Sequence, residues 1–385
     1  VDTLINARWE ITVEPDCVAQ DHHSVAILAG RIVAVEPTET AKTRFSAGEF
    51  IDRPSHVVLP GLVNANTHAA MSLLRGIADD LPLMDWLNEH IFPAEARFIR
   101  PETVRWGTLL ACAEMLLAGT TCCCGGYFLE DTVAQTVAET GLRAVLAQGV
   151  IDFPAPGVAD PSLNIDHARQ YAIKWKGRQL STTPSIFCHS PYTCSDRTLT
   201  SAKRIADELG LTFQVHVAET RFERDQSIRD KGRSPVAHLD RLGILDPTTL
   251  MAHCVWVDGK DIAIMAKRGC KVVHCPESNM KLASGIAPVS RMDKAGITVG
   301  IGTDGCASNN NLDMFGEMDT AAKLHKLATG DPTALNATRV LKMATIDGAR
   351  AIGLNDRIGS LEIGKQADIV VLDTCVPHLL SLIHI

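Results

Sequence analysis

The fold of this chain is decided by the stretch HVVLPGLVNANTHAAM at residues 56–71, because its first half recurs as a pattern along the sequence. HVVLPGLV is a short continuous apolar run, which is typical of a strand buried on both faces. Similar runs follow at residues 120–124, 143–150, 185–189, 212–217, 249–253, 270–274 and 298–303. Segments of helical period lie between them, for example SDRTLTSAKRIADEL, where Ser195 suits the helix N-cap. Eight such strands alternating with helices predict an α/β protein, a (β/α)8 TIM barrel over residues 59–354.

Both ends of the chain have a different pattern. Short strand-like runs with turn signals occur in residues 1–58, as in SVAILAGRIVAVEP, and again in IGSLEIGKQADIVVLD at residues 358–373. We expect residues 1–58 and 355–379 to pair into a small β-sandwich. The pattern is lost after Asp373. We interpret the last residues, LSLIHI at 380–385, as a sequencing or cloning scar on a truncated reading frame, which would leave the C-terminal part of the sandwich truncated.

Composition limits the class of protein. The 385 residues are 46% hydrophobic and carry a net charge of −8, and the basic residues are scattered, which argues against a nucleic-acid partner. The 12 cysteines show no disulfide framework, and three are consecutive at residues 122–124, so we expect reduced thiols in a cytoplasmic protein. Without a leader or an apolar run of bilayer length, no membrane partner is expected. Self-association is left open.

Polar residues follow the predicted strands at the point where each strand ends. The active site of a (β/α)8 barrel lies at the carboxyl ends of its strands, so these residues should converge. They are Asn66, His68, His189, His216, Glu219, His253, His274 and Asp304. Each alone is explained by ordinary packing, a turn or a helix cap. The combination of His68, His216, Glu219, His253 and Asp304 instead indicates a metal site.

The residue types suit metal-assisted hydrolysis. A Zn²⁺ ion held by two or three imidazoles and one carboxylate keeps an open position for water and lowers the pKa of that water to about 7. A carboxylic acid three residues beyond a ligand can move protons between water and substrate. A histidine that does not ligate can stabilise the developing oxyanion, and Asp304 can act as both ligand and base. His and Asp ligands would also accept Fe²⁺ or Mn²⁺.

The chain resembles the amidohydrolase superfamily, in the branch of 5-methylthioadenosine/S-adenosylhomocysteine deaminases and their chlorohydrolase relatives. The resemblance is carried by PGLVNANTHAAMSLLRGIADDLPLMDWL, PAEARF, HSPYTCS, HVAET, AHC, SNMKLASGIAPV and GTDGCASNNNLDMFGEM, in this order, over nearly the whole barrel. It implies one divalent metal ion, most simply Zn²⁺, and hydrolytic removal of the amino group from C6 of an adenine ring, with release of ammonia. The small-molecule substrate would be an adenine nucleoside.

Residue roles follow from the resemblance position by position. It implies that His68, His216 and Asp304 are metal ligands, with Glu219 as proton shuttle and His253 as electrostatic partner. Glu95 would accept hydrogen bonds from the ribose hydroxyls, and His189 would line the substrate side chain. Trp86 would give apolar surface there or serve only in helix packing.

This sequence departs from the family at three places. Asn66 stands where the family has histidine, and it can offer the metal at best a weak carbonyl oxygen. Gly125 and Gly126 stand where an acidic residue is usual. After the third strand, some members have arginines that hold the carboxylate of S-adenosylhomocysteine, whereas this chain has Gln148 and no arginine between Arg143 and Arg169. We therefore expect 5′-methylthioadenosine as substrate before S-adenosylhomocysteine or adenosine.

Two alternatives stay open. The same scaffold serves other aminopurine or guanine-type deaminases and triazine chlorohydrolases. The substitution at Asn66 also allows an inactive, metal-poor barrel.

Overall fold

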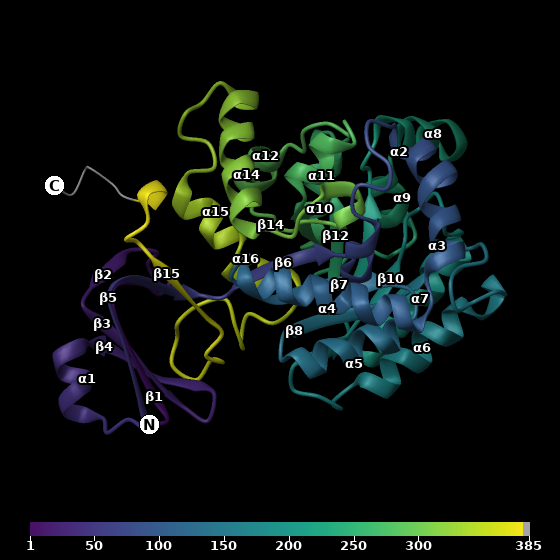
Figure 1. The fold of residues 1–385 in the computed structure, drawn as a ribbon. Helices are drawn as coiled ribbons and strands as arrows, with labels where there is room; N and C mark the ends of the chain where they lie inside the picture. Colours follow the sequence, from purple (N-terminus) through teal and green to yellow (C-terminus); the bar gives the residue numbers. More distant parts are fainter. Residues whose placement is uncertain (380–385) are drawn as a thin grey trace.

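The computed structural model describes residues 1–379 and contains a barrel and a separate N-terminal sheet (Figure 1). The predicted scar at residues 380–385 lies outside the described residues. Parallel strands form the barrel in the order β14-β13-β12-β11-β10-β8-β7-β6. Their bounds are β6 (Leu62–Thr67), β7 (Thr120–Tyr127), β8 (Arg143–Val150), β10 (Ile186–Cys188), β11 (Phe213–Val217), β12 (Thr249–His253), β13 (Lys271–His274) and β14 (Thr298–Ile301). The short β9 (Thr182–Pro184) pairs with β8. The predicted barrel is confirmed.

The barrel closes between its last strand, β14, and its first strand, β6, through contacts of the residues that follow β14. There the backbone N–H of Asp304 donates to the carbonyl of Asn66 at 2.9 Å. Gly302 allows this approach, because a Cβ at that position would lie 2.6 Å from the backbone nitrogen of Asn66. Closure of the barrel thus brings the start and the end of its sequence together.

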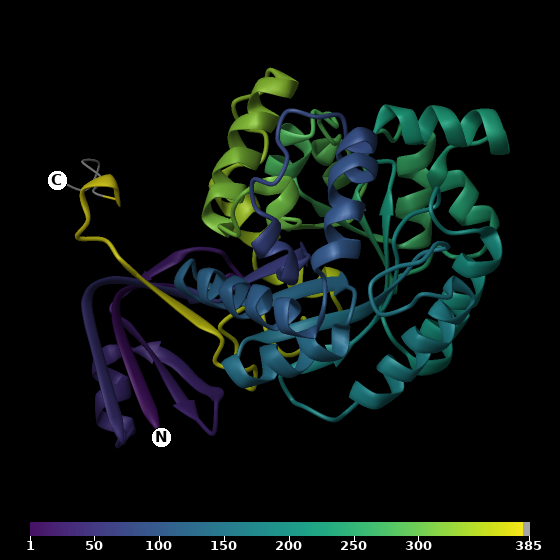
Figure 2. The same ribbon diagram turned by 45° about the vertical axis from the view of Figure 1, so that its right-hand side comes forward.

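Helices surround the strands of the barrel (Figures 1 and 2). The predicted N-cap is confirmed, since Ser195 Oγ accepts from the backbone N–H of Thr198, and Gly210 ends the same helix at φ +63°. The helices that follow the barrel strands are α4 (Pro101–Leu117), α5 (Glu130–Thr140), α6 (Asn164–Trp175), α7 (Asp196–Leu209), α8 (Arg221–Lys231), α9 (Pro235–Arg241), α10 (Gly259–Arg268), α12 (Val289–Lys294), α14 (Met314–Thr329), α15 (Ala337–Met343) and α16 (Ile346–Ala351).

Shorter helices lie in the loops between the barrel elements and near the two ends of the chain. They are α1 (Thr38–Arg44), η1 (Ala69–Leu74), α2 (Leu83–Asp85), the π-helical η2 (Trp86–Ile91), α3 (Phe92–Phe98), η3 (Pro161–Leu163), α11 (Pro276–Lys281), α13 (Cys306–Asn309) and η4 (Pro377–Leu379). Of the described helices, none has the length and apolar character needed to cross a bilayer.

The first apolar run of the sequence is divided between two sheets. Residues 56–60 end β5 (Glu49–Pro60) in the N-terminal sheet, and the barrel begins with β6 at Leu62. Gly61 joins the two strands, and a Cβ there would meet Thr121 Oγ1 at 2.0 Å. The single strand expected at 56–63 is therefore wrong, because both sheets bury apolar residues and the sequence pattern does not distinguish them. As a result Asn66 lies inside β6 and His68 directly follows it.

The N-terminal sheet contains strands from both ends of the chain, which confirms the predicted pairing. The order is β15-β5-β1-β3-β4, with β2 beside β1, and β15 runs antiparallel to β5. Figure 1 shows β15 in yellow along the purple strands. The remaining bounds are β1 (Thr3–Ile11), β2 (Ala19–Asp21), β3 (His23–Leu28), β4 (Arg31–Pro37) and β15 (Ile369–Asp373). Within the strand-like pattern expected at residues 358–373, one strand forms, which is β15. Residues 358–366 form turns instead, and they place Leu361 in the core of this sheet.

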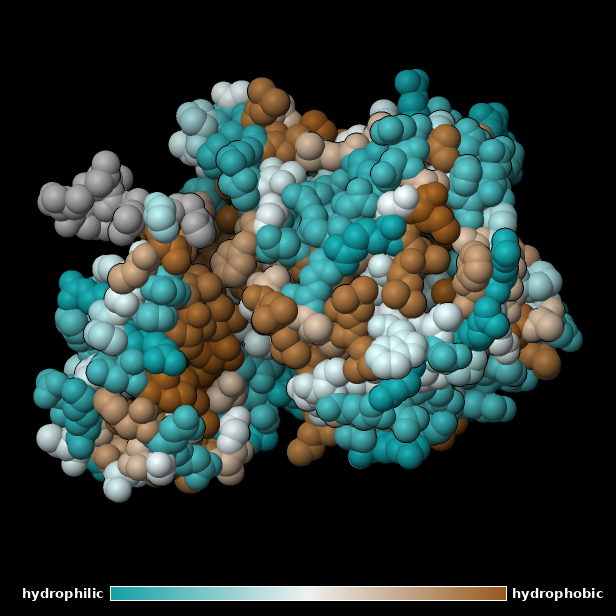
Figure 3. Space-filling view, viewed as in Figure 1, coloured by the Kyte–Doolittle hydropathy of each residue, from teal (hydrophilic) through white to brown (hydrophobic). Residues whose placement is uncertain are grey.

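The surface carries exposed apolar side chains in two areas, over the N-terminal sheet beside the barrel and over α4 (Figure 3). On α4 these side chains are Trp106, Leu110, Leu116 and Leu117. All cysteines are free thiols, and most are buried, including Cys122, Cys123 and Cys124 inside β7. The three adjacent thiols therefore pack in the barrel wall. The domain boundaries drawn from the sequence stay a prediction.

Candidate metal centre and active site

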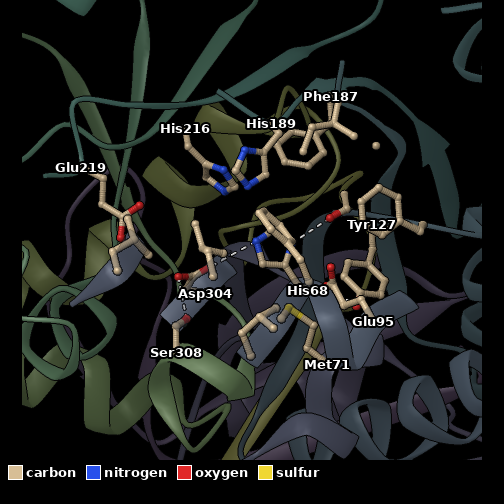
Figure 4. A pocket seen from close by; sticks show the side chains of 18 of the residues that line it. His68, Met71, Glu95, Tyr127, Phe187, His189, His216, Glu219, Asp304 and Ser308 are labelled. Atoms are coloured by element: carbon tan, nitrogen blue, oxygen red, sulfur yellow. Dashed lines mark hydrogen bonds and ion pairs between the residues drawn. The ribbon is translucent and has the colours of Figure 1, made fainter. Parts of the chain in front are cut away.

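A pocket opens at the carboxyl ends of the barrel strands, where the predicted site residues meet (Figure 4). Its polar lining consists of His68, Glu95, Tyr127, His189, Tyr192, His216, Glu219, His253, Asp304 and Ser308. Its apolar lining comes mainly from the segment that contains α2, η2 and α3, and from Phe128, Ile151, Phe187 and Leu282. The pocket is thus polar at the strand ends and apolar toward the helical segment.

Three side chains at the floor of the pocket could hold a metal ion. One ligand atom each from His68, His216 and Asp304 lies within 4.8 Å of the others. His68 Nδ1–H donates to the carbonyl of Gly126 at 2.7 Å, and Nε2 on the other side of the ring faces Asp304, 3.2 Å from its Oδ1. The Nε2 atom of His216 is buried without a hydrogen-bond partner. Two imidazole nitrogens and a carboxylate fit a divalent metal ion.

Asp304 is held firmly in place. Its Oδ2 accepts hydrogen bonds from Ser278 at 2.7 Å and Ser308 at 2.8 Å, and its backbone is in the left-handed region at φ +60°. Such a conformation in a residue other than glycine persists only where its surroundings enforce it. Burial opposes ionisation of the carboxyl, but the hydrogen bond from His68 and the charge of His253 outweigh it and hold the pKa of Asp304 well below its usual value. The residue is therefore a carboxylate at neutral pH.

The side chain of Asn66 faces the carboxylate of Asp304. The side chain is buried, and its Nδ2 lies 3.4 Å from Asp304 Oδ1 and 3.6 Å from Cys275 Sγ. The amide thus makes a long hydrogen bond to the same carboxylate oxygen that His68 approaches. A role of Asn66 as a weak ligand stays a prediction.

Glu219 lies on the far side of Asp304 from His68, and His253 lies near it (Figure 4). His253 Nδ1–H donates to Asn279 Oδ1 at 2.9 Å, and its Nε2 lies 3.8 Å from Glu219 Oε2. Burial raises the pKa of the Glu219 carboxyl above its usual value, although His253 acts in the other direction. Burial alone would lower the pKa of His253, but Glu219 and Asp304 raise it above its usual value. The pair can hold and transfer a proton at this wall.

Glu95 and Tyr127 form a hydrogen-bonded pair at the other wall. The Tyr127 hydroxyl donates to Glu95 Oε1 at 2.6 Å, and burial raises the pKa of Glu95 to about 7. The sequence did not identify Tyr127, because the second strand extends to this residue and not only to Cys124. A tyrosine directly after Gly125 and Gly126, at a strand end, was the available signal.

The other predicted residues lie as follows. The ring of His189 lies 5.2 Å from that of His216, and its Nδ1 lies 2.9 Å from Thr193 Oγ1. Burial lowers the pKa of His189 to about 4, so this imidazole is neutral. Trp86 lines the pocket with its buried side chain. His274, by contrast, is not in the pocket lining, because it pairs with His325 at 3.1 Å between their Nε2 atoms.

The two further departures from the family pattern have structural correlates. A Cβ at Gly126 would lie 2.4 Å from the ring of Phe187, so this position allows the phenyl ring to fill the pocket wall. Gln148 is not in the pocket lining, and its Oε1 accepts from the backbone N–H of Glu130 at 3.1 Å. Among the described residues, neither arginine nor lysine lines the pocket. Its ionisable lining is acidic apart from the histidines.

Comparisons with known proteins agree with this chemistry. Residues 57–384 match the sequence profile of the Amidohydrolase family. A 5-methylthioadenosine/S-adenosylhomocysteine deaminase of Syntrophobacter fumaroxidans is 48% identical over 378 residues, which cover 98% of this chain and 86% of that protein. A 5′-deoxyadenosine deaminase of Methanosarcina acetivorans is 43% identical over 381 residues, which cover 98% of this chain and 86% of that protein.

A solved structure is similar over the full length of the chain. It is an adenosine deaminase of Xanthomonas campestris with bound zinc, with a TM-score of 0.97 and 43% sequence identity. The alignment covers 100% of this chain and 87% of that chain.

Proposed function

The chain belongs to the amidohydrolase family, and from this premise we propose that it is a zinc-dependent deaminase that hydrolyses the 6-amino group of adenine nucleosides, preferentially 5′-methylthioadenosine. The observation that carries the proposal is the convergence of His68, His216 and Asp304 within 4.8 Å, beside a buried carboxyl group on Glu219. The three similar proteins described above are named as adenine-nucleoside deaminases, which supports the same reaction.

The proposed ligands are His68, His216 and Asp304, with Asn66 as a weak fourth oxygen donor. A divalent ion bound there supplies Lewis-acid activation of a water molecule. The hydrogen bond from His68 Nδ1 to the Gly126 carbonyl keeps Nε2 free for this role, and the orphaned Nε2 of His216 is accounted for in the same way. Zinc is proposed among the ions that this donor set accepts because it is the ion bound in the similar solved structure.

The chain's own groups then move the protons. The Asp304 carboxylate accepts a proton from the attacking water, whose oxygen forms a bond to C6 of the adenine ring. Glu219 is protonated readily because burial raises its pKa, so it donates to a ring nitrogen. His253, held by Asn279, donates from Nε2 to the oxygen added at C6. The C6–N bond breaks when the amino group takes up the proton held by Asp304, the hydroxyl at C6 returns a proton to Glu219 and becomes a carbonyl, and ammonia leaves.

The remaining wall recognises the sugar. In this proposal Glu95 accepts hydrogen bonds from the ribose hydroxyls, and His189 and Trp86 contact the substrate; the presence of all three in the pocket lining supports these roles. Because neither arginine nor lysine lines the pocket in the described part of the chain, the carboxylate of S-adenosylhomocysteine would lose its water without a dedicated cationic partner. A neutral 5′-substituent has no such cost, which supports a preference for 5′-methylthioadenosine.

Ammonia release over a substrate panel tests this proposal. The panel contains adenosine, 5′-methylthioadenosine, S-adenosylhomocysteine, guanine and a chlorotriazine, each assayed with zinc-loaded protein. We expect the highest kcat/KM for 5′-methylthioadenosine and at least tenfold less for S-adenosylhomocysteine. Turnover of guanine or the triazine without turnover of any adenine nucleoside would overturn the proposal. Metal analysis of the same protein separates an inactive barrel from a wrong substrate.

A further inference from the structure

A second cavity adjoins the main pocket on the side away from the proposed metal ligands. It measures about 250 Å³, and it is lined by Phe92, Ala96, Phe128, Ala159 and the segment 153–156 (FPAP), together with Glu95. We call this cavity the apolar annex. Phe92, Glu95 and Phe128 also line the main pocket, so the two spaces share a wall. In Figure 4, Glu95 lies on the far side of His68 from Asp304 and Glu219, which is the side where the annex begins.

The segment after β8 that forms the annex is fixed by its own hydrogen bonds. Ala155 and Val158 exchange backbone hydrogen bonds of 3.1 and 2.9 Å around Gly157, which has φ +81°. The ring of Phe153 packs edge-on against that of Phe92, with 5.2 Å between centroids. The annex is therefore formed in advance, so a ligand does not bear the entropic cost of ordering it.

The annex has the size and chemistry of an alkyl or aryl subsite. Its volume of about 250 Å³ far exceeds the 10–15 Å³ that one water molecule needs on the same measure. Apart from Glu95, every lining side chain is apolar. Glu95 would repel an anionic group, and no lining residue of the annex could pair with one.

We propose that the annex is a subsite for bulky apolar 5′-substituents, so that the enzyme deaminates 5′-alkylthio- and 5′-arylthio-5′-deoxyadenosines larger than the methyl compound. The inference rests on the proposed function, because it requires the adenine ring at the metal centre and the ribose at Glu95. A substituent at the 5′ position of the ribose then extends past the residues that line both the main pocket and the annex. Each methylene group that enters the annex loses contact with water, which favours binding.

A homologous series of substrates measures this effect. With 5′-methylthio, propylthio, butylthio and benzylthio adenosines, kcat/KM of the unaltered enzyme should rise two- to fourfold for each methylene from methyl to butyl. Fourfold corresponds to about 0.8 kcal/mol per buried methylene. A steady fall of kcat/KM with chain length would show that the annex does not receive the substituent and would overturn the inference.

Filling the annex gives the second arm. Ala155→Phe and, separately, Ala159→Phe should lower kcat/KM for the butylthio and benzylthio compounds at least tenfold, while adenosine and methylthioadenosine change less than twofold. Ala295→Phe, at an exposed position at the end of α12, is the matched control and should change none of these values. An equal loss for adenosine and for the benzylthio compound in both filled variants would contradict a subsite.

Binding measurements keep this test separate from the proposed function. If no adenine nucleoside releases ammonia, the proposed function fails, and calorimetric titration of the same series still measures the annex directly. Dissociation constants that decrease from methyl to butyl, and no longer do so in Ala155→Phe and Ala159→Phe, support the subsite. Dissociation constants independent of chain length overturn it.

Discussion

Replacement of Asn66 by histidine is the sharpest test of the proposed metal centre. The residue lies at the end of β6, two positions before His68, so alternate side chains of the strand direct both residues to the same side. Its amide nitrogen is 3.4 Å from Asp304 Oδ1, which is one of the proposed ligand atoms. An imidazole at this position would add a nitrogen ligand to the three converging ligand atoms of His68, His216 and Asp304. The substitution would also remove the amide that hydrogen-bonds the Asp304 carboxylate.

The size of the effect can be estimated from these contacts. A hydrogen bond as long as the one from Asn66 contributes about 0.5 kcal/mol at most, so its loss alone should change metal affinity no more than about threefold. Residues that orient a ligand through a short, well-formed hydrogen bond, which Asn66 does not make, contribute about 10- to 100-fold to metal affinity. A new direct ligand should exceed that range. We therefore expect Asn66→His to bind Zn²⁺ at least about 100-fold more tightly, equivalent to about 2.7 kcal/mol.

Competition with a chromophoric chelator at pH 7.5 measures the affinity, and the zinc content after dialysis gives an independent value. Asn66→Ala is the matched control, because it removes the amide without adding a donor, and its affinity should stay within about threefold of the parent. Turnover of methylthioadenosine should rise with zinc content. Equal affinities of Asn66→His and the parent protein would refute the assignment of this position to the metal site.

Three further substitutions test separate parts of the structure. Tyr127→Phe removes the hydrogen bond that orients Glu95, so KM for adenosine should rise about tenfold while kcat changes less than about twofold. KM for 2′,3′-dideoxyadenosine, which lacks the ribose hydroxyls, should stay constant. An equal rise of KM for both nucleosides would contradict a role of Glu95 in ribose binding. Glu219→Gln should lower kcat at least 100-fold at unchanged zinc content, and retained turnover would exclude Glu219 as the proton shuttle. Burial raises the pKa of Glu10 from 4.5 to about 7, and both of its carboxylate oxygens lack hydrogen-bond partners. The ionised Glu10 side chain therefore destabilises the fold: the effect is absent below pH 4.5, develops as the pH rises to about 7 and is complete above pH 7. Glu10→Met should therefore raise the free energy of unfolding by about 3 kcal/mol at pH 8 and by little at pH 4, as measured by urea denaturation, and the same gain at both pH values would contradict this origin.

The sequence located the strand ends because two patterns coincide there. Continuous apolar runs show where strands are buried on both faces, and a polar residue at the end of such a run stands out against them. His216 and His253 were found in this way, and each closes or lies within a strand of the structure. His274 has the same local pattern, but it pairs with His325 of α14, outside the pocket lining. The local pattern shows that a residue is at a strand end, and the direction of its side chain depends on the neighbouring elements.

Contacts between distant segments decided what the sequence left open. Tyr127 and Glu95 come from β7 and α3, and nothing in either segment indicates that the hydroxyl of one meets the carboxylate of the other. The annex likewise forms only where the segment after β8 packs against Phe92.

By itself, the sequence determined the alternation of strands and helices, the barrel, the pairing of both chain ends and the set of ionisable residues at the strand ends. These follow from periodicity and residue type, which act over a few residues. Only the tertiary structure decided that β6 begins after Gly61, that Asn66 turns its amide to Asp304 and that an apolar annex adjoins Glu95. Each of these depends on the closure of the barrel or on loop packing, which joins residues far apart in the chain.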